Sequence, residues 1–357
     1  MKLNVLQVCD HLGWEGSRMH GVKRLFAWMI PRFDAERYNV SLVSLRKKDL
    51  SEETLESFGV DIKIDILHLH GYGATTFGRI AGAMRRLPTI VHEHANLTDT
   101  PWFQKIADRA LEPVTDIAIA VSQSTADYVI KARRIPPPKV KVVYLGVPLE
   151  EFSRQRSADE IQAARAELGI APDDVAIGTV TRLHDSKGNS FLVDAARLVL
   201  NERPHAREQQ ARALGLGDRF SFAGFAKDVP RVVSAFDISV FPSLWEGTPL
   251  TVFEALAMGK AIVATDADGL LDVLTSEHDA IIVPKRDARA LANGLIRVID
   301  EPDTRDRLRA AAAETGKKYD ISLFVRKMER LYRVSRATKR KGVLVSDLSF
   351  LTGNAPV

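Results

Sequence analysis

The chain has 357 residues, 45% hydrophobic and 27% charged, with a net charge of +4 and a single cysteine, Cys9. This length favours two domains, since one core rarely exceeds ~250–300 residues, and the composition excludes a disordered or fibrous protein. A lone cysteine excludes an intramolecular disulfide and suits a reducing compartment. We expect a cytoplasmic protein, because no apolar run reaches the ~18 residues of a membrane span and the first residues do not resemble a signal peptide. The modest charge and the lack of a recognisable motif argue against a nucleic-acid partner.

Strand and helix patterns alternate along the first half of the chain. Apolar runs predict strands at 3–9, 38–45, 64–70, 89–94, 116–122 and 140–145, and amphipathic patterns predict helices at 22–33, 50–58, 76–86, 102–111 and 125–131. Such alternation is typical of parallel sheets in a doubly wound α/β fold. The run 144–160 interrupts it with Gly146 and Pro148, and we interpret this run as the domain link.

The second half repeats the pattern. It predicts strands at 175–180, 220–223, 238–242, 261–266 and 280–283, and helices at 191–201, 207–214, 229–236, 249–258, 288–299, 304–315 and 322–337. We therefore expect an α/β protein of two Rossmann-like lobes, with domains at 1–150 and 151–325 and a C-terminal helix and basic tail at 326–357. Parallel sheets bind ligands at the carboxyl ends of their strands, so the predicted site is a central cleft that both sheets face.

The strongest site signal is the run 241–259, FPSLWEGTPLTVFEALAMG. Thr248 suits a helix N-cap, Pro249 the first helical position and Gly259 the helix stop. A helix that begins at the end of a strand offers unpaired backbone N–H groups to an anion such as a diphosphate; here these belong to Gly247, Thr248, Leu250 and Thr251. Glu246 in the loop and Glu254 in the helix could bind sugar and ribose hydroxyls. The alternative is a surface glutamate and a solvated helix glutamate.

A basic cluster follows the predicted strand 175–180. Arg182 and Lys187 lie beside a turn that contains Gly188. A guanidinium can bind phosphate through two hydrogen bonds and an ammonium adds a point charge. Together they could stabilise a departing nucleoside diphosphate without a metal. The alternative is a basic surface turn.

Four histidines form two H-x-H pairs on neighbouring predicted strands: His68, His70, His92 and His94. Each pair places both rings on one face of its strand. Three interpretations stay open: a zinc site, histidines satisfied at strand ends, and a histidine that contacts the sugar. The loop after the first strand, with Gly13, Gly16 and Gly21, lacks the G-x-G-x-x-G nucleotide fingerprint and is weak evidence.

The second half resembles retaining glycosyltransferases of the GT-B fold, in particular glycosyltransferase family 4. Its matching segments are TRLHDSKGN at 181–189, FAGF at 222–225, the E-x7-E pair Glu246 and Glu254, and ATDADG at 264–269 with Asp272. The first half matches more loosely, at Gly21, DILHLHG at 65–71, VHEH at 91–94, AVS at 120–122 and VYLGV at 143–147. The resemblance covers roughly residues 1–335.

This resemblance implies a hexosyltransferase that moves a sugar from a nucleotide-sugar donor to a glycan or lipid-linked acceptor. It implies retention of the anomeric configuration and no metal or other cofactor. Arg182 and Lys187 would bind the diphosphate, Glu254 the ribose and Glu246 the donor sugar. The remaining roles would fall to Gly247, Thr248 and Leu250 at donor groups, Gly224 and Phe225 near the base, His94 at the sugar, and Gly21 near the phosphates and acceptor.

The sequence departs from the family pattern at several places. His20-Gly21 replaces a glycine pair, Lys23 an acidic residue, Asp268-Gly269 a second glycine pair and Asp272 a glutamate. These changes bear on donor and acceptor choice. The D-x-D run 266–268 follows the E-x7-E helix instead of lying early in a nucleotide lobe, so we do not interpret it as a metal site.

Two further enzyme or binding classes remain as alternatives: a nucleotide-sugar epimerase of the same fold, and a partial or inactive glycosyltransferase-like binding protein. The second arises because the runs 59–65 and 202–208 are shorter than in related chains. Two basic stretches could also contact anionic membrane at the inner face. These are 326–341 and the group Lys131, Arg133, Arg134, Lys139 and Lys141. For the first, the alternative is a helix packed on the body by Met328, Leu331 and Tyr332.

Overall fold

The structure is a computed structural model that describes residues 2–10, 21–45, 64–95, 101–202, 220–341 and 351. It divides into two compact units, the first comprising Met1–Gly146 with Ile321–Val357, and the second Val147–Asp320. The C-terminal helix therefore belongs to the first unit. Several sequence predictions lie outside the described residues: the helices at 50–58 and 207–214, the glycines at 13 and 16, and the shortened runs near 59–63 and 203–208.

In the described residues of the first unit, six strands form a parallel sheet in the order β2-β1-β3-β4-β5-β6. The strands are β1 (Leu3–Cys9), β2 (Tyr38–Ser44), β3 (Ile66–His70), β4 (Thr89–Glu93), β5 (Ile117–Ala120) and β6 (Val140–Val142). Its helices are α1 (Gly21–Met29), α2 (Tyr72–Arg85), α3 (Trp102–Leu111), α4 (Gln123–Lys131) and α13 (Ile321–Lys341), with short 3-10 turns at Ile30–Arg32, Glu112–Val114 and Pro137–Lys139. All five residues of β3 and all four of β5 are buried, as expected for a sheet covered on both faces.

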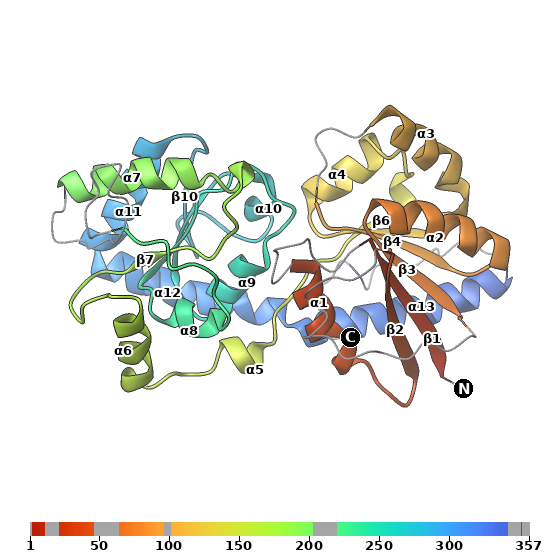
Figure 1. The fold of residues 1–357 in the computed structure, drawn as a ribbon, viewed down its shortest axis with the longest axis horizontal. Helices are drawn as coiled ribbons and strands as arrows, with labels where there is room; N and C mark the ends of the chain where they lie inside the picture. Colours follow the sequence, from red (N-terminus) through yellow and green to blue (C-terminus); the bar gives the residue numbers. More distant parts are fainter. Residues whose placement is uncertain are drawn as a thin grey trace. The chain divides into compact units, whose positions relative to one another are not determined.

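Helices cover both faces of this sheet (Figure 1). Helices α2, α3 and α4 lie on one face, and α1 and α13 lie on the other. Helix α13 is held by Met328, Leu331 and Tyr332, which are fully buried. Its basic residues also make local contacts, since Lys339 pairs with Asp116 at 2.7 Å and Arg336 pairs with Asp65. Met328, Leu331 and Tyr332 therefore pack α13 onto its own unit. The helix extends to Lys341.

The second unit has a parallel sheet with the order β10-β9-β8-β7 in the described part of the chain. The strands are β7 (Ile177–Gly178), β8 (Ile238–Phe241), β9 (Ala261–Thr265) and β10 (Ile281–Val283). The helices are α5 (Leu149–Phe152), α6 (Ala158–Glu167), α7 (Asn189–Glu202), α8 (Val229–Ser234), α9 (Leu250–Ala257), α10 (Asp268–Leu271), α11 (Ala288–Asp300) and α12 (Pro302–Gly316), with 3-10 turns at Asp185–Lys187 and Lys317–Tyr319. The core lies between the sheet, α7, α11 and α12, with Ile238, Val263 and Leu308 fully buried.

Some predicted strands of this unit are wrong or too long. No strand forms at 220–223, and β7 spans only two residues of the predicted 175–180. Phe220 is buried against Ala196 and Leu200 of α7, whereas Phe222 is about half exposed. Only the ring of Phe220 therefore holds residues 220–223 against α7. The alternation of apolar and polar residues in this run is not that of a strand with one buried face. The two units thus each carry a parallel sheet with helices, which is the predicted pair of Rossmann-like lobes.

Candidate functional site

The predicted donor residues of the second unit gather where its strands end. Lys187 follows β7 and Glu246 follows β8, and their side chains form an ion pair. The Nζ of Lys187 lies 2.5 and 2.7 Å from the two carboxylate oxygens of Glu246. Ser243 donates its hydroxyl to Glu246 Oε1 at 2.7 Å. Both partners are mostly buried, with 14% and 8% of their side chains exposed, so the pair interacts in a medium of low dielectric constant.

Two glycines allow three loops to meet around this pair. Gly188 has a φ of +64°, and a Cβ there would lie 1.9 Å from the carbonyl oxygen of Pro242. A Cβ at Gly269 would lie 1.8 Å from the carbonyl oxygen of Gly247. Because either side chain would push the loops apart, glycine is required at both positions. The amide of Leu244 also donates to Ser186 O at 2.8 Å, which ties the Lys187 turn to the Glu246 loop.

The start of helix α9 differs from the sequence prediction. The helix begins at Leu250, and Pro249, with extended backbone, occupies the N-cap position. Thr248 does not cap the helix; its hydroxyl donates to the carbonyl of Gly247 at 2.7 Å. Gly247, Thr248 and Leu250 are all buried at this end of α9. The predicted helix stop is confirmed, since Gly259 follows the end of α9 with a φ of +58°.

The other predicted donor residues fall into buried and exposed groups. Glu254 is fully buried on α9. Arg182 is exposed, and its guanidinium forms no ion pair or hydrogen bond with the residues that the structure describes. Gly224 and Phe225 are also exposed, and Gly224 has a φ of +77° with no atom of the described residues within 4 Å of a Cβ placed there. The structure thus brings Lys187, Glu246 and the start of α9 together and leaves Arg182 available to a ligand.

The D-x-D run has local structural roles. Asp266 accepts a hydrogen bond from the backbone N–H of Lys285 at 2.8 Å, and Asp268 lies 3.7 Å from the ammonium of the same lysine. Both carboxylates therefore serve to fix the turn after β10.

In the first unit, the four histidines form a hydrogen-bonded network with two residues that the sequence analysis did not assign. One branch runs from Gln7 Oε1 to His70 Nε2 at 2.8 Å and from His70 Nδ1 to His94 Nε2 at 2.8 Å. The other branch leads from Gln7 Nε2 to the Tyr332 hydroxyl at 2.9 Å, on to His68 Nδ1 at 2.7 Å, and from His68 Nε2 to His92 Nδ1 at 3.2 Å. The network therefore joins three strands and α13.

The buried imidazoles of this network are neutral. Burial, together with neighbouring histidines, lowers the pKa of His68 to about 3 and lowers the pKa values of His70 and His92 well below the ordinary range. A neutral imidazole carries one N–H and one lone pair. Because the Gln7 Oε1 can only accept a hydrogen bond, His70 carries its proton on Nε2. The Nδ1 of His70 is then an acceptor, so His94 carries a proton on the Nε2 that faces His70. A flipped amide would reverse each of these assignments.

A metal ion would compete with this network. Ring nitrogens of His68, His70 and His92 lie within 4.8 Å of one another, as a metal site would need. The hydrogen bonds already occupy both nitrogens of His68 and of His70, and their partners are uncharged. A metal ion would have to displace these hydrogen bonds, because a ring nitrogen that donates or accepts one cannot also bind the ion. The geometry therefore favours a hydrogen-bonded network.

The end of β4 next to His94 is fixed by buried ion pairs. Arg133 contacts Glu93 and lies 2.9 Å from Asp108, and Asp108 also contacts Arg79. Arg133 was one of five residues proposed for membrane contact, and its burial corrects that assignment. Gly21 begins α1, and no atom of the described residues lies within 4 Å of a Cβ placed there. Its neighbour His20 lies outside the described residues.

Two family models of glycosyltransferases match separate parts of the chain. Residues 7–151 match the model described as Glycosyltransferase Family 4, and residues 174–301 match that described as Glycosyl transferases group 1. The UDP-Gal:alpha-D-GlcNAc-diphosphoundecaprenol alpha-1,3-galactosyltransferase of Escherichia coli is 24% identical over 67% of each chain. The phosphatidyl-myo-inositol mannosyltransferase of Mycobacterium leprae is 24% identical over 83% of this chain and 80% of its own.

A solved structure shares the fold. Anabaena Alr3699/HepE in complex with UDP-glucose superposes with a TM-score of 0.75 at 20% identity, over 92% of this chain and 99% of that one. Across the described residues, no helix has both the length and the apolar character needed to cross a membrane.

Proposed function

We propose that this chain, whose two parts match models of glycosyltransferases, is a GT-B glycosyltransferase of the family 4 type that transfers a hexose from a nucleotide sugar to a glycan or lipid-linked acceptor with retention of anomeric configuration. The observation that carries this proposal is the Lys187–Glu246 pair at the strand ends, beside the start of α9 and Arg182, whose guanidinium has no partner among the described residues. A nucleotide sugar has both an anionic diphosphate and a sugar with hydroxyl groups. The pair offers a cation to the first and a carboxylate to the second.

In this proposal the residues take the roles that the family resemblance implies. Arg182 and Lys187 bind the diphosphate, together with backbone N–H groups around Gly247, Thr248 and Leu250. Glu246 binds the donor sugar, and Glu254 binds the ribose. Gly224 and Phe225 lie near the base, His94 contacts the sugar, and Gly21 lies near the phosphates and acceptor.

Donor binding breaks the Lys187–Glu246 pair in this proposal. The ammonium turns to the phosphate, and the carboxylate is released to accept hydrogen bonds from the sugar hydroxyls. As the sugar–phosphate bond breaks, negative charge grows on the departing diphosphate, and Arg182 and Lys187 stabilise that charge. No metal is then required, so the rate of transfer should be unchanged by a chelator.

The two alternatives make different products. An epimerase converts a nucleotide sugar without any acceptor, whereas an inactive binding protein leaves it unchanged. The family matches are to glycosyltransferases and favour neither alternative. A thermal-shift screen over UDP-, GDP- and ADP-sugars identifies the donor, and NMR of the product formed with lipid-linked acceptors gives its anomeric configuration. Acceptor-dependent transfer with retention supports the proposal, whereas an inverted product or acceptor-independent conversion contradicts it.

Membrane contact belongs to the same proposal, because a lipid-linked acceptor lies at a membrane surface. Arg326, Arg330 and Arg333 are exposed on one face of α13, opposite its buried stripe. Each such charge near anionic lipid contributes about 1 kcal/mol. Sedimentation with vesicles should depend on anionic lipid and weaken when Arg326 and Arg330 are changed to Gln; equal sedimentation with neutral vesicles argues against this contact.

A further inference from the structure

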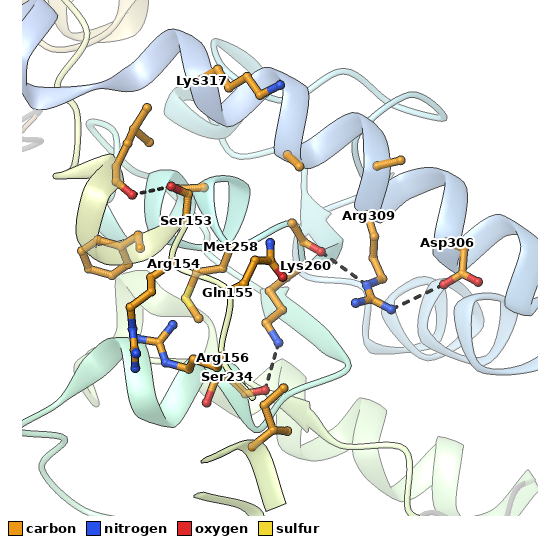
Figure 2. A pocket seen from close by; sticks show the side chains of 17 residues that line it. Ser153, Arg154, Gln155, Arg156, Ser234, Met258, Lys260, Asp306, Arg309 and Lys317 are labelled. Carbon is orange, nitrogen blue, oxygen red and sulfur yellow. Dashed lines mark hydrogen bonds and ion pairs between the residues drawn. The ribbon is translucent and has the colours of Figure 1, made fainter. Parts of the chain in front are cut away.

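The second unit contains a cavity of about 550 Å³ that is distinct from the proposed donor site (Figure 2). Its walls come from residues 149–156, from the C-terminal end of α9 with Lys260, and from α12. Helix α9 begins beyond the carboxyl end of β8 and returns to the start of β9. The cavity therefore lies at the amino edge of the parallel sheet, whereas the Lys187–Glu246 pair lies at the carboxyl edge.

The charged side chains that line this cavity are almost all basic. They comprise one acid, Asp306, and five bases, Arg154, Arg156, Lys260, Arg309 and Lys317. Figure 2 shows Arg154 and Arg156 on one side of the cavity and Arg309 on the other, with Lys260 between them. The excess of positive charge predicts an anionic ligand.

Not all of these charges are available to a ligand. Arg154 pairs with Glu160 at 2.6 Å, and Lys317 pairs with Glu314 at 2.5 Å. Arg309 lies 3.5 Å from Asp306, and both side chains are exposed, so this contact is weak. Within the described ranges, Arg156 makes no hydrogen bond or ion pair. Arg156 and Arg309 are therefore the guanidinium groups that a ligand could engage at low cost.

Lys260 has an unusual environment for an ammonium group. Its Nζ donates to the backbone carbonyls of Ser234 at 3.1 Å and Phe236 at 2.6 Å, and it has no carboxylate partner among the residues described. Burial, together with the positive charge of Arg309, lowers the pKa of Lys260 to about 8. An ammonium has three N–H donors, so one remains for a ligand. A half-buried cation next to other cations is unfavourable until an anion joins it.

We propose that this cavity binds the phosphate group of a phosphorylated molecule through Lys260, Arg156 and Arg309. Phosphate suits these partners because its several oxygens can accept from two guanidinium forks and an ammonium at once. The cavity falls within the ~300–1,000 Å³ of small-molecule sites, which leaves room for an organic group on the phosphate. That group belongs to a soluble phosphorylated compound or to a phospholipid headgroup, and both present the same phosphate chemistry.

Inorganic phosphate is the probe for the first test. Calorimetry on the full chain should show a phosphate site whose affinity falls at least about tenfold in Arg156→Gln and in Lys260→Met. Lys318→Gln is the matched control, because Lys318 is exposed next to Lys317 but does not line the cavity. Arg182→Ala distinguishes the sites, since it should weaken phosphate binding at the donor site and leave the cavity unaffected.

The protonation of Lys260 provides a second readout. Bound phosphate should raise the pKa of Lys260 from about 8, so binding at pH 8 should take up protons, seen as a dependence of the binding enthalpy on buffer ionisation enthalpy. Lys260→Met should abolish that uptake. The proposal is overturned if Arg156→Gln and Lys260→Met both bind phosphate as Lys318→Gln does, or if Arg182→Ala removes all phosphate binding. If Arg182→Ala left all phosphate binding unchanged while Arg156→Gln and Lys260→Met weakened it, the proposed donor site would be contradicted and this inference would stand.

Vesicles distinguish the two sources of phosphate. The ligand is a phospholipid headgroup if the protein binds phosphatidic acid vesicles, if free phosphate competes with that binding, and if Arg156→Gln weakens it. Phosphate binding without such vesicle binding assigns a soluble compound. Either outcome supports a phosphate site in the cavity.

Discussion

The Nδ1 of His70 lies 2.8 Å from the Nε2 of His94, and the other ring nitrogen of His70 is held by Gln7 at the same distance. His94, which we propose contacts the donor sugar, is therefore oriented by a buried residue that is itself oriented by an amide. Because the pKa of His70 is strongly lowered, His70 stays neutral at physiological pH and acts as a fixed hydrogen-bond acceptor.

The first prediction concerns the tautomers of these two rings. Nitrogen NMR should find the proton of His70 on Nε2 and the proton of His94 on Nε2 at neutral pH. Gln7→Glu should raise the pKa of His70, because a carboxylate there favours the charged ring. It should also shift the pH profile of transfer. Gln7→Leu should disturb His94 without raising the pKa of His70. A proton on His70 Nδ1 in the unaltered protein would contradict the assignment.

The second prediction concerns acid stability. His68 has a folded pKa of about 3 against an ordinary value of 6.5, and the pKa values of His70 and His92 are also lowered. Below pH 6.5 the unfolded chain therefore binds protons that the folded unit does not. The free energy of unfolding that depends on these neutral histidines is fully present above pH 6.5 and is lost as pH falls toward 3. The urea midpoint should fall steeply over that range.

His68→Gln supplies the matched comparison for acid stability. The amide can replace some hydrogen bonds but does not titrate, so the urea midpoint of this variant should depend less on pH. The same pH slope in both proteins would show that the buried histidines do not control acid unfolding.

The sequence predicted the alternation of elements well, because buried parallel strands and amphipathic helices carry distinct periods. It also predicted the strand–loop–helix around Glu246, where Pro249 and Gly259 mark the helix ends. The cap was misassigned because Thr248 and Pro249 are both compatible with a helix start, and only backbone geometry decides which one caps.

Long-range pairing explains what the sequence could not predict. Tyr332 lies 264 residues from His68 and 325 from Gln7, so its place in the network depends on where α13 packs. The burial of Arg133 is not predictable from its neighbours in sequence, because its partners Asp108 and Glu93 lie 25 and 40 residues away. The basic cavity similarly combines segments near 154, 260 and 309.

The third prediction concerns that buried ion cluster. Asp108 lies between Arg79 and Arg133, and all three side chains are almost fully buried. Asp108→Asn would leave two guanidinium groups short of negative charge, so it should lower the free energy of unfolding by about 3–5 kcal/mol. Asp127→Asn removes an exposed partner of Lys131 and should cost at most about 1 kcal/mol. Chemical denaturation checks both, and equal losses would contradict a special role for Asp108.

The fourth prediction concerns the Lys187–Glu246 pair. In the unaltered protein the ammonium of Lys187 must break its contact with the carboxylate of Glu246 before it binds phosphate. Glu246→Gln removes that carboxylate, so nucleoside diphosphate should bind as tightly as before or more tightly. Transfer should fall, because the carboxylate that binds the sugar is gone. Lys187→Met should instead weaken nucleotide binding. Calorimetry and transfer rates separate these effects, and weaker nucleotide binding in Glu246→Gln would argue against the exchange of partners.

The most direct test of the account is the calorimetric affinity of Arg182→Ala for UDP, GDP and ADP. Arg182 has no described partner in the protein, so its removal should leave the fold intact while it removes a charge-assisted contact of about 1.5–3 kcal/mol. We predict that the nucleotide that binds the unaltered protein best binds this variant roughly ten- to a hundred-fold more weakly. Arg289→Ala, an exposed change on α11, should have no such effect. Unchanged affinity in Arg182→Ala would contradict the proposed donor site.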